Sequence, residues 1–499
     1  MSTVVLNGAG TTVAEIAAIA RKDAIVEIAP DVHDRLVRAR AILDQSAASG
    51  QQIYGLNTGL GANLKTSVTE DISAFQQQLV RGRAMGVGPS LARDTTRAVM
   101  AARLSMLSVG GSGISPDVFN DLLALLNKRV HPIVRSIGSI GAGDLVLLSA
   151  IAQALIGEGK AEYQGEVYPS GQALEKAGLV PSGLGPKDGL SLLNASAVSV
   201  GQGALVAVDA ASLLDFQRQT AALSFEALGG NPLILIPAIQ HARPATGQVG
   251  EAEKLLALLE GSSLFEAKAA IQDPLSLRCI APIHGAVAHA VNAATEAVEI
   301  ELNAAADNPL VILDEGRVLS TGNFHTPSLA LVFETLGLAI AQAALASAAR
   351  FIQLTGSGRN GLPRYLTPVG GTSAGFVPLQ KTVTALVGAV RHKANPVLLD
   401  FLPVSEGVED HATQTPLTVA KCADMMDLWR NLVACEMLAA AQAVDLRPGH
   451  RCGNGTEETY RFVRATAAKL EEDRALGDDV STLAGRLRAG LDCSCSVSN

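Results

Sequence analysis

Apolar residues recur at intervals of three and four positions over four long stretches beyond residue 190. The stretches cover residues 192–216, 282–305, 328–354 and 418–446. This spacing places apolar side chains along one face of an α-helix, and each stretch is longer than an average helix. We therefore expect a bundle of long helices. The breaks in it are expected at prolines, namely Pro274, Pro309, Pro363 and Pro396.

The first part of the chain instead alternates short helical patterns with glycine-rich turns. The turns lie at residues 54–63, 86–90, 108–115 and 137–144. Glycine lets the backbone approach other groups closely, so each turn is a candidate site loop, although most turns of this kind only connect elements. The change of pattern predicts an N-terminal globular part over residues 1–195 and a helical bundle over residues 196–499.

Composition favours an all-α fold. The 499 residues are 48% hydrophobic, 17% charged and 3% aromatic, which suits helices that pack through small side chains. Because the chain is this apolar, we expect it to bury part of its surface between subunits. The net charge of −9, without a run of lysine or arginine, argues against nucleic acid as a partner.

Further features predict a cytoplasmic protein with neither a membrane span nor a metal site. The N-terminal segment lacks the basic flank and apolar core of a signal peptide. The apolar stretch 328–348 carries Glu334, as a buried helix does rather than a membrane span. The six cysteines form no disulfide ladder, and Cys493 and Cys495 have no nearby histidine with which to bind zinc. His411 likewise lacks further ligands at helical spacing.

Short segments spread along the whole chain carry a resemblance. They are YGLNTGLG (54–61), GVG (86–88), GSIGAGDL (138–145), GLSLLNASA (189–197), QDPLSLRC (272–279), ELNAAADNP (301–309), GNFH (322–325) and VEDH (408–411). In order and spacing they resemble the histidine and phenylalanine ammonia-lyases, which eliminate ammonia from aromatic amino acids. The resemblance implies a mainly helical fold of the fumarase/aspartase-like type with a long central bundle. It also implies a homotetramer whose active sites form where several subunits meet.

One segment departs from the pattern of these lyases. Their electrophilic cofactor, methylidene-imidazolone, forms when an Ala-Ser-Gly triplet before Asp-Leu cyclises and loses water. Here the residues before Asp144 are Gly141, Ala142 and Gly143, so only Ala142 and Gly143 stand where the three residues of the triplet are expected. No hydroxyl or thiol can be lost from them. The sequence therefore predicts that this cofactor is absent and that the protein uses no cofactor.

An enzyme without this electrophile needs a substrate with a built-in leaving group, such as a trimethylammonium group. In this respect the chain resembles the ergothionase branch of the superfamily, which splits ergothioneine into thiourocanate and trimethylamine. That resemblance implies a cofactor-independent carbon–nitrogen lyase that acts on a small imidazole betaine. Two alternatives stay open. One is a lyase for hercynine, histidine or another amino acid, and the other is a catalytically silent ligand-binding homologue.

Several residues match family positions with known roles. The resemblance implies that Tyr54 is the base for the β-proton and that Arg278 and Asn194 hold the substrate carboxylate. It further implies that Phe324 packs on the substrate ring and that Glu409 recognises an imidazole. A tyrosine serves as a base where positive charge stabilises its phenolate, and a planar guanidinium suits a carboxylate. Without the resemblance, each residue would as readily be assigned to packing, helix capping or a salt bridge.

Other positions depart from the family. Arg83 stands where the family carries a histidine or an aromatic residue that selects the ring, and Leu275 replaces a family tyrosine. Lys381, next to Gln380, introduces a cation where the family is usually apolar. One interpretation is a surface lysine. The functional interpretation sets Lys381 against the sulfur of a 2-thioimidazole, where with Glu409 it polarises the ring. Arg83 and Gln380 are assigned to substrate binding.

Overall fold

The computed structural model describes residues 2–63, 65, 67–68, 71–268, 270–356, 358, 361–399 and 402–494. The chain divides into two compact units, neither of which is continuous in sequence. The first unit holds Met1–Val208, Ala294–Val332 and Pro396–Ala420, and the second holds Asp209–Ala293, Phe333–Asn395 and Lys421–Asn499. The sequence, by contrast, predicts two consecutive parts that meet near residue 195. Helices dominate both units, which confirms the predicted all-α class.

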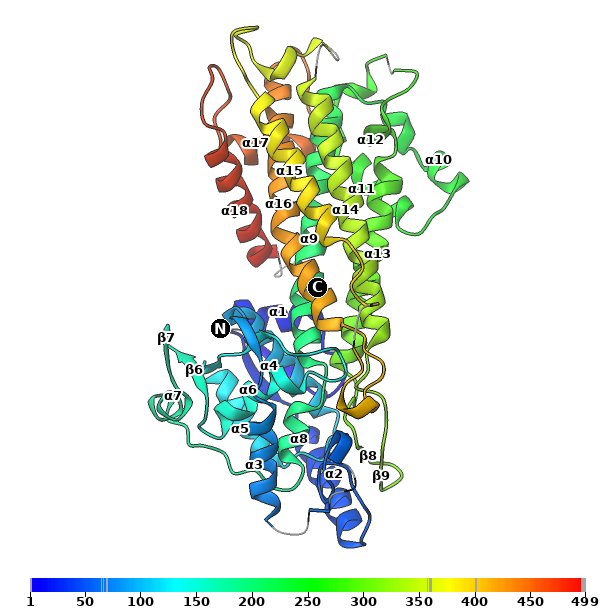
Figure 1. Cartoon of the computed structure of the whole chain (residues 1–499). Coiled ribbons are helices and arrows are strands. Elements are labelled where there is room, and N and C mark those ends of the chain that lie inside the picture. The colour runs from blue at the N-terminus through cyan, green and yellow to red at the C-terminus, as the bar shows by residue number, and fades with distance from the viewer. Residues whose placement is uncertain are drawn as a thin grey trace. The chain divides into compact units, whose positions relative to one another are not determined.

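The first unit combines short helices with small sheets (Figure 1). Its helices are α1 (Val13–Arg21), α2 (Pro30–Ala48), α3 (Ile72–Arg83), α4 (Arg93–Ser108), α5 (Pro116–Asn127), α6 (Leu145–Leu155), α7 (Ser170–Ala177) and α8 (Asp188–Leu193). Strand β1 (Thr3–Leu6) pairs in parallel with β2 (Ile25–Ile28), and β3 (Val87–Ser90) pairs antiparallel with β5 (Arg135–Ile137). The remaining strands form antiparallel ladders, namely β4 (His131–Pro132), β6 (Lys160–Tyr163) and β7 (Glu166–Pro169), and β8 (Leu310–Ile312) with β9 (Arg317–Leu319).

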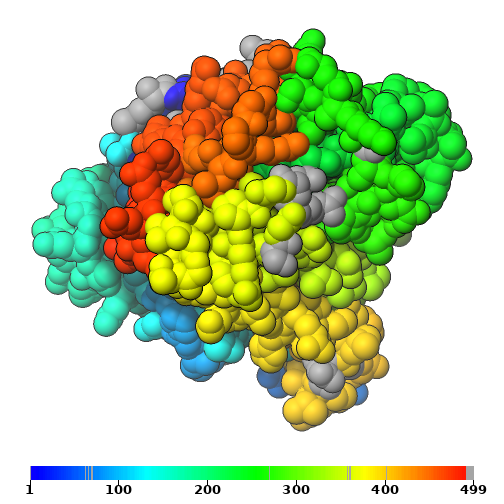
Figure 2. Space-filling model, turned by 90° about the horizontal axis from the view of Figure 1, so that it is seen from above, coloured from blue at the N-terminus to red at the C-terminus, as the bar shows by residue number. Residues whose placement is uncertain are grey.

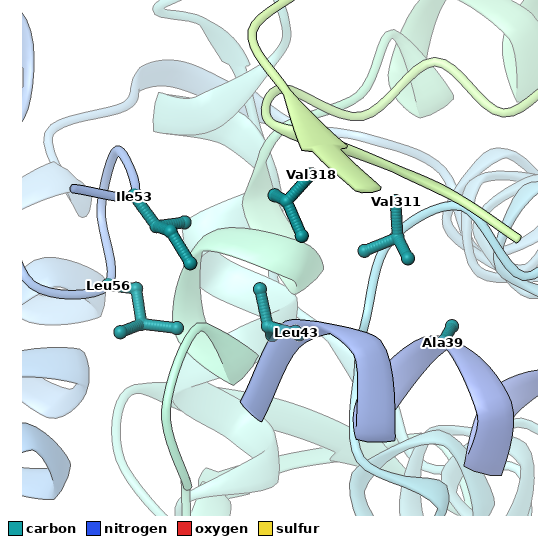
Figure 3. Packing of buried hydrophobic residues seen from close by; sticks show 6 residues of the cluster. All are labelled: Ala39, Leu43, Ile53, Leu56, Val311 and Val318. Carbon is teal, nitrogen blue, oxygen red and sulfur yellow. The ribbon is translucent and has the colours of Figure 1, made fainter. Parts of the chain in front are cut away.

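A buried apolar cluster fixes the loop that follows α2. Figure 3 shows its members, which come from α2, from the next loop and from the β8–β9 hairpin, namely Ala39, Leu43, Ile53, Leu56, Val311 and Val318. Each is at most 3% exposed, and burying one aliphatic side chain of valine, leucine or isoleucine contributes roughly 1.5–3 kcal/mol. Because Ile53 and Leu56 both enter the cluster, the residues between them are held at a fixed position.

The long helices predicted from the apolar spacing are confirmed. They are α9 (Ala197–Leu228), α13 (Ile280–Leu302), α14 (Pro327–Thr355) and α16 (Thr415–Asp445), and each has residues in both units. The second unit adds α10 (Pro237–Ala242), α11 (Gln248–Leu258), α12 (Leu275–Arg278), α15 (Val377–Lys393), α17 (Asn454–Arg464) and α18 (Gly477–Ser494). Short 3₁₀ turns lie at η1 (Gly61–Asn63), η2 (Pro232–Leu235), η3 (Ser263–Phe265), η5 (Arg364–Leu366) and η6 (Ser405–Gly407). The four expected prolines all lie outside the long helices.

Within the second unit, a fully buried ion pair joins neighbouring helices. Arg350 on α14 donates to both carboxylate oxygens of Glu436 on α16, at 2.6 and 3.0 Å, and both side chains are 0% exposed. Ser224 on α9 donates a third hydrogen bond of 2.7 Å to the same carboxylate. Figure 1 shows α14, α15 and α16 side by side. Figure 2 shows the orange-to-red C-terminal helices bordering both the yellow segment around α15 and the green segment with α11.

One face of α14 is apolar and uncovered in the single chain. Leu338, Leu345 and Ile352 are 51%, 53% and 42% exposed, and they follow one another at intervals of seven residues.

By length and composition, two helical stretches of the described chain could cross a membrane, Asp188–Leu228 and Pro327–Thr355, although 72% and 56% of their most apolar windows are buried. Core helices of soluble proteins pass the same test. The seven-residue repeat of Leu338, Leu345 and Ile352 on α14 is typical of a helix that packs against another helix.

We predict that Arg350→Met lowers the free energy of unfolding by about 3–5 kcal/mol, because it leaves the Glu436 charge buried without its partner. The double variant Arg350→Met/Glu436→Met should recover most of this loss. The control is Arg461→Met, which removes a pair with Glu457 whose arginine is 74% exposed and should cost less than about 1 kcal/mol. Urea denaturation followed by circular dichroism measures all three. Equal losses in Arg350→Met and Arg461→Met would contradict the importance of the buried pair.

Candidate active site

A cavity of about 370 Å³ lies in the first unit. This volume is in the range of about 300–1,000 Å³ that is usual for small-molecule sites. Its wall includes Ala142 and five of the residues proposed from sequence, namely Tyr54, Arg83, Asn194, Phe324 and Glu409. These residues are spread over more than three hundred positions of the chain, so the fold brings together what the sequence separates.

Tyr54 enters the cavity from the loop that the apolar cluster anchors. The next residue, Gly55, has a φ of +69°, and a side chain there would come within 2.4 Å of Leu190 Cδ2. Only glycine therefore permits this close turn against α8. The Tyr54 hydroxyl accepts a hydrogen bond of 2.9 Å from the backbone N–H of Gly61. The phenolic oxygen is thus fixed by a donor that would also stabilise negative charge on it.

Arg83, at the end of α3, is the only cation among the described residues that line the cavity. Burial lowers the pKa of its guanidinium, while attraction to Tyr54 and to Glu409 raises it. One positive charge therefore lies near both a candidate base and a candidate ring-binding carboxylate. Glu409 accepts a hydrogen bond of 2.7 Å from Ser405 Oγ, and its backbone pairs with that of Val404. The carboxylate is consequently oriented by its own loop.

The loop at Ala142 does not fit the methylidene-imidazolone of the resembling lyases. Ala142 lines the cavity but has no hydroxyl to lose. A side chain at Gly141 would come within 2.1 Å of Thr413 Oγ1, and one at Gly143 within 3.0 Å of Asn194 Oδ1. Both glycines have positive φ, +82° and +72°. A serine at either flanking position would therefore strain the backbone, and at Gly141 it would also collide with Thr413.

The Asp144 carboxylate holds the loop of Gly141, Ala142 and Gly143 in place. It is 0% exposed and accepts hydrogen bonds from Ser139 Oγ at 2.7 Å and from the backbone N–H groups of Val198 and Ser199 at 3.0 and 3.1 Å. Burial raises the pKa of the Asp144 carboxyl to about 6, against these hydrogen bonds, which lower it. The two N–H groups belong to the first turn of α9, where a helix favours negative charge. The loop is thus fixed to the start of α9.

Asn194 and Phe324 form another part of the wall. Asn194 is 5% exposed and donates from Nδ2 to the backbone oxygen of Asn308 at 2.8 Å. The backbone oxygen of Phe324 accepts a hydrogen bond of 2.9 Å from Ser196 Oγ. In the residue after Phe324, Nε2 of His325 lies 2.7 Å from Nδ1 of His411. The segments that carry Phe324 and Glu409 are therefore tied together beside the cavity.

The other proposed residues lie in the second unit and do not line this cavity. The Gln380 side chain donates to Thr355 Oγ1 at 2.9 Å. Lys381 is exposed on α15. The surface of α15 at Gly388 is open, because a side chain there would meet nothing within 4 Å. Among the described residues, neither Lys381 nor Arg278 has a side-chain hydrogen-bond or ion-pair partner.

Sequence reasoning overlooked some residues of the wall. Ser405, which orients Glu409, lies in a segment without any recognised motif. Asn308 belongs to a segment that resembles the family and Asn63 to the glycine-rich turn 54–63, but neither side chain carried an assigned role. Leu275, the substitution within the arginine motif, is 61% exposed on α12. The amides and hydroxyl of Asn63, Asn308 and Ser405 could serve many structural purposes, so sequence alone gives little reason to select these residues.

Comparison with known proteins extends the picture. The family model described as aromatic amino acid lyase matches residues 11–465. A histidine ammonia-lyase of Treponema denticola is 38% identical over 481 residues, which are 96% of this chain and 95% of that protein. The solved ergothionase of Treponema denticola, in complex with desmethyl-ergothioneine sulfonic acid, is 33% identical with a TM-score of 0.93, covering 98% of this chain and 99% of that one. Histidine ammonia-lyase from Trypanosoma cruzi is 29% identical with a TM-score of 0.91, covering 99% and 94%.

The match to the histidine ammonia-lyase and the match to the ergothionase of Treponema denticola each cover at least 95% of both chains, and the solved structure shares the helical fold. The resemblance expected from sequence is confirmed. The chain belongs to the aromatic amino acid lyase family and is an enzyme of the carbon–nitrogen lyase type.

Proposed function

We propose that this lyase needs no electrophilic cofactor and eliminates trimethylamine from ergothioneine to give thiourocanate. The observation that carries the proposal is the loop Gly141-Ala142-Gly143, which offers no hydroxyl yet lies on the wall of a cavity that keeps a base and charged groups. A substrate with a quaternary ammonium group supplies its own leaving group. The similarity to the ergothionase of Treponema denticola supports this choice.

The reaction needs one base and no redox step. The Tyr54 phenolate takes the β-proton, the electrons of that C–H bond form the Cα–Cβ double bond, and trimethylamine leaves with the electrons of the C–N bond. The nearby Arg83 guanidinium and the Gly61 N–H stabilise the phenolate before the proton moves. The proton then passes from Tyr54 to solvent, which restores the base. A trimethylammonium group has no N–H to compete for this base.

Charge and shape in the cavity support an imidazole ring as the other half of the substrate. The Glu409 carboxylate, oriented by Ser405, accepts a ring N–H. Phe324 provides an apolar surface for the ring. Asn194 binds the substrate carboxylate or faces the leaving group. These roles rest on the positions of the side chains around the cavity and on the chemistry that each group can perform.

We further propose a cytoplasmic homotetramer in which neighbouring copies complete each site. Arg278 and Lys381, from the second unit, carry positive charges without a partner among the described residues. The uncovered stripe of Leu338, Leu345 and Ile352 is suited to helix packing between copies. In the assembly, Arg278 and Gln380 contribute to substrate binding. Lys381 faces the sulfur of the thioimidazole and stabilises negative charge as the β-proton leaves.

A second candidate is elimination from hercynine or histidine. It is favoured by the relative in Treponema denticola whose name is histidine ammonia-lyase and by Glu409, which suits any imidazole. Histidine, however, carries a protonated amino group, whose N–H protons are far more acidic than its β C–H. Hercynine has the trimethylammonium group but no sulfur for Lys381. Ergothioneine is therefore the substrate that uses all of these groups.

We predict that purified protein incubated with ergothioneine develops the long-wavelength ultraviolet band of thiourocanate and releases trimethylamine. Hercynine should react more slowly, because it gives Lys381 no sulfur to stabilise, and histidine should not react. Absorbance scans and an amine assay measure the products in parallel. A urocanate band from histidine, together with no reaction of ergothioneine, would show that the proposal is wrong.

We predict that Tyr54→Phe lowers kcat for ergothioneine by about 10²–10⁴-fold with little change in KM, because a general base contributes about this much. Tyr168→Phe is the matched control, since Tyr168 lies on the β7 strand away from the cavity. Steady-state kinetics of both variants test the role. Equal kcat values for Tyr54→Phe and the native enzyme would exclude Tyr54 as the base.

We predict that Glu409→Gln raises KM for ergothioneine roughly 10–150-fold, because a hydrogen bond to a charged group contributes about 1.5–3 kcal/mol. Glu406→Gln makes the same chemical change on an exposed residue of the same loop and should leave KM unchanged. The readout is KM from initial rates. If both variants changed KM alike, the effect would belong to the loop and not to recognition of the ring.

A further inference from the structure

Three potential metal ligands converge in the second unit, in a place unrelated to the proposed chemistry. They are a carboxylate oxygen of Glu226, a ring nitrogen of His450 and the thiol sulfur of Cys452, which all lie within 4.8 Å of one another. His450 and Cys452 also line a cavity of about 900 Å³. The sequence predicts no metal site, and the glutamate is separated from the other two ligands by more than two hundred residues.

The carboxylate of Glu226 is held in place before any ligand arrives. It is 0% exposed. One oxygen accepts from Gly453 N–H at 2.8 Å and from Thr456 Oγ1 at 2.9 Å, and the other accepts from Ser262 Oγ at 2.8 Å. This second oxygen also lies 2.5 Å from Nε2 of His450. Only this last contact needs to change for the oxygen to bind a cation.

The neighbours of His450 favour a ring that turns its free nitrogen toward Glu226. Ser263 Oγ lies 3.1 Å from His450 Nδ1 and donates its own proton to the backbone oxygen of Arg451 at 3.3 Å. It is therefore an acceptor for Nδ1–H. With Nδ1 protonated, Nε2 either carries a second proton or binds a metal ion. Partners of this type on the outer nitrogen accompany most histidines that ligate metals.

We propose that Glu226, His450 and Cys452 bind a divalent ion of the zinc class. Thiolate, imidazole and carboxylate are the ligand types that zinc combines in tetrahedral sites, and water from the adjoining cavity supplies the fourth position. The ion takes the place of the proton between Glu226 and His450, and the Cys452 thiol loses its proton on binding. The other hydrogen bonds of the carboxylate stay as they are.

The proposed role of the ion is structural. Glu226 lies in the last turn of α9, Ser262 directly precedes η3, and Gly453 is the N-cap of α17. A bound ion would fasten the segment of His450 and Cys452 to the end of α9. None of these residues lines the cavity that holds Tyr54. Metal binding should consequently raise thermal stability without being required for turnover.

The test uses the full-length protein, freed of metal with a chelator and titrated with Co²⁺. We expect visible bands of tetrahedral cobalt and a near-ultraviolet thiolate-to-cobalt band that saturates at one ion per chain. Zn²⁺ should displace the cobalt and raise the melting temperature. Cys452→Ser should remove the thiolate band and the gain in melting temperature while circular dichroism remains native. His450→Asn provides a second variant with the same expected loss of binding.

The control is Cys493→Ser/Cys495→Ser, which removes the last two cysteines of the sequence and should leave the cobalt spectrum intact. Absence of a thiolate band from the native protein would overturn the proposal. So would a band that persists in Cys452→Ser or disappears in the Cys493/Cys495 variant. In the first case the cluster would be an ion pair of His450 with Glu226 beside a protonated cysteine.

Discussion

The arrangement of the candidate site depends on the buried carboxylate of Asp144. A buried charge is costly unless it is hydrogen-bonded, and this one is compensated by Ser139 and by the first turn of α9. Its own backbone N–H donates to the oxygen of Ala195 at 2.8 Å. The loop that carries Ala142 and the turn that carries Asn194 are therefore fixed to one another. This contact therefore holds in position the parts of the cavity wall that Ala142 and Asn194 form.

Around this anchor, the cavity combines rigid supports with a small set of charges. The apolar cluster of α2 and the β8–β9 hairpin holds the loop of Tyr54. Arg83 and Glu409 attract one another electrostatically. The hydrogen bond that orients the Glu409 carboxylate comes from Ser405. Groups that are oriented but not neutralised by a direct partner can still act on a substrate. This separation of support from chemistry suits the proposed reaction, which relies on electrostatics instead of a covalent electrophile.

The fold could be predicted from sequence to a large extent, and the site only in part. Helical spacing predicts the long helices, because each must bury one apolar face. Glycine turns and family motifs predict Tyr54 and Glu409 but not Ser405, whose hydroxyl acts through one local hydrogen bond. Each of the two units is built from separate stretches of the chain. Local patterns cannot predict this division, because it depends on contacts between distant segments. For the same reason spacing rules cannot find the cluster of Glu226, His450 and Cys452.

The close packing on either side of Ala142 also bears on how the protein can evolve. Replacing Ala142 by serine would restore a hydroxyl, but one position would still be missing before Asp144. An inserted residue would have to displace Thr413 or Asn194, which occupy the space beside the two glycines. A three-residue loop thus requires an insertion and accommodating changes at distant positions together. Single substitutions therefore cannot rebuild the triplet, and the two glycines limit which insertions the loop tolerates.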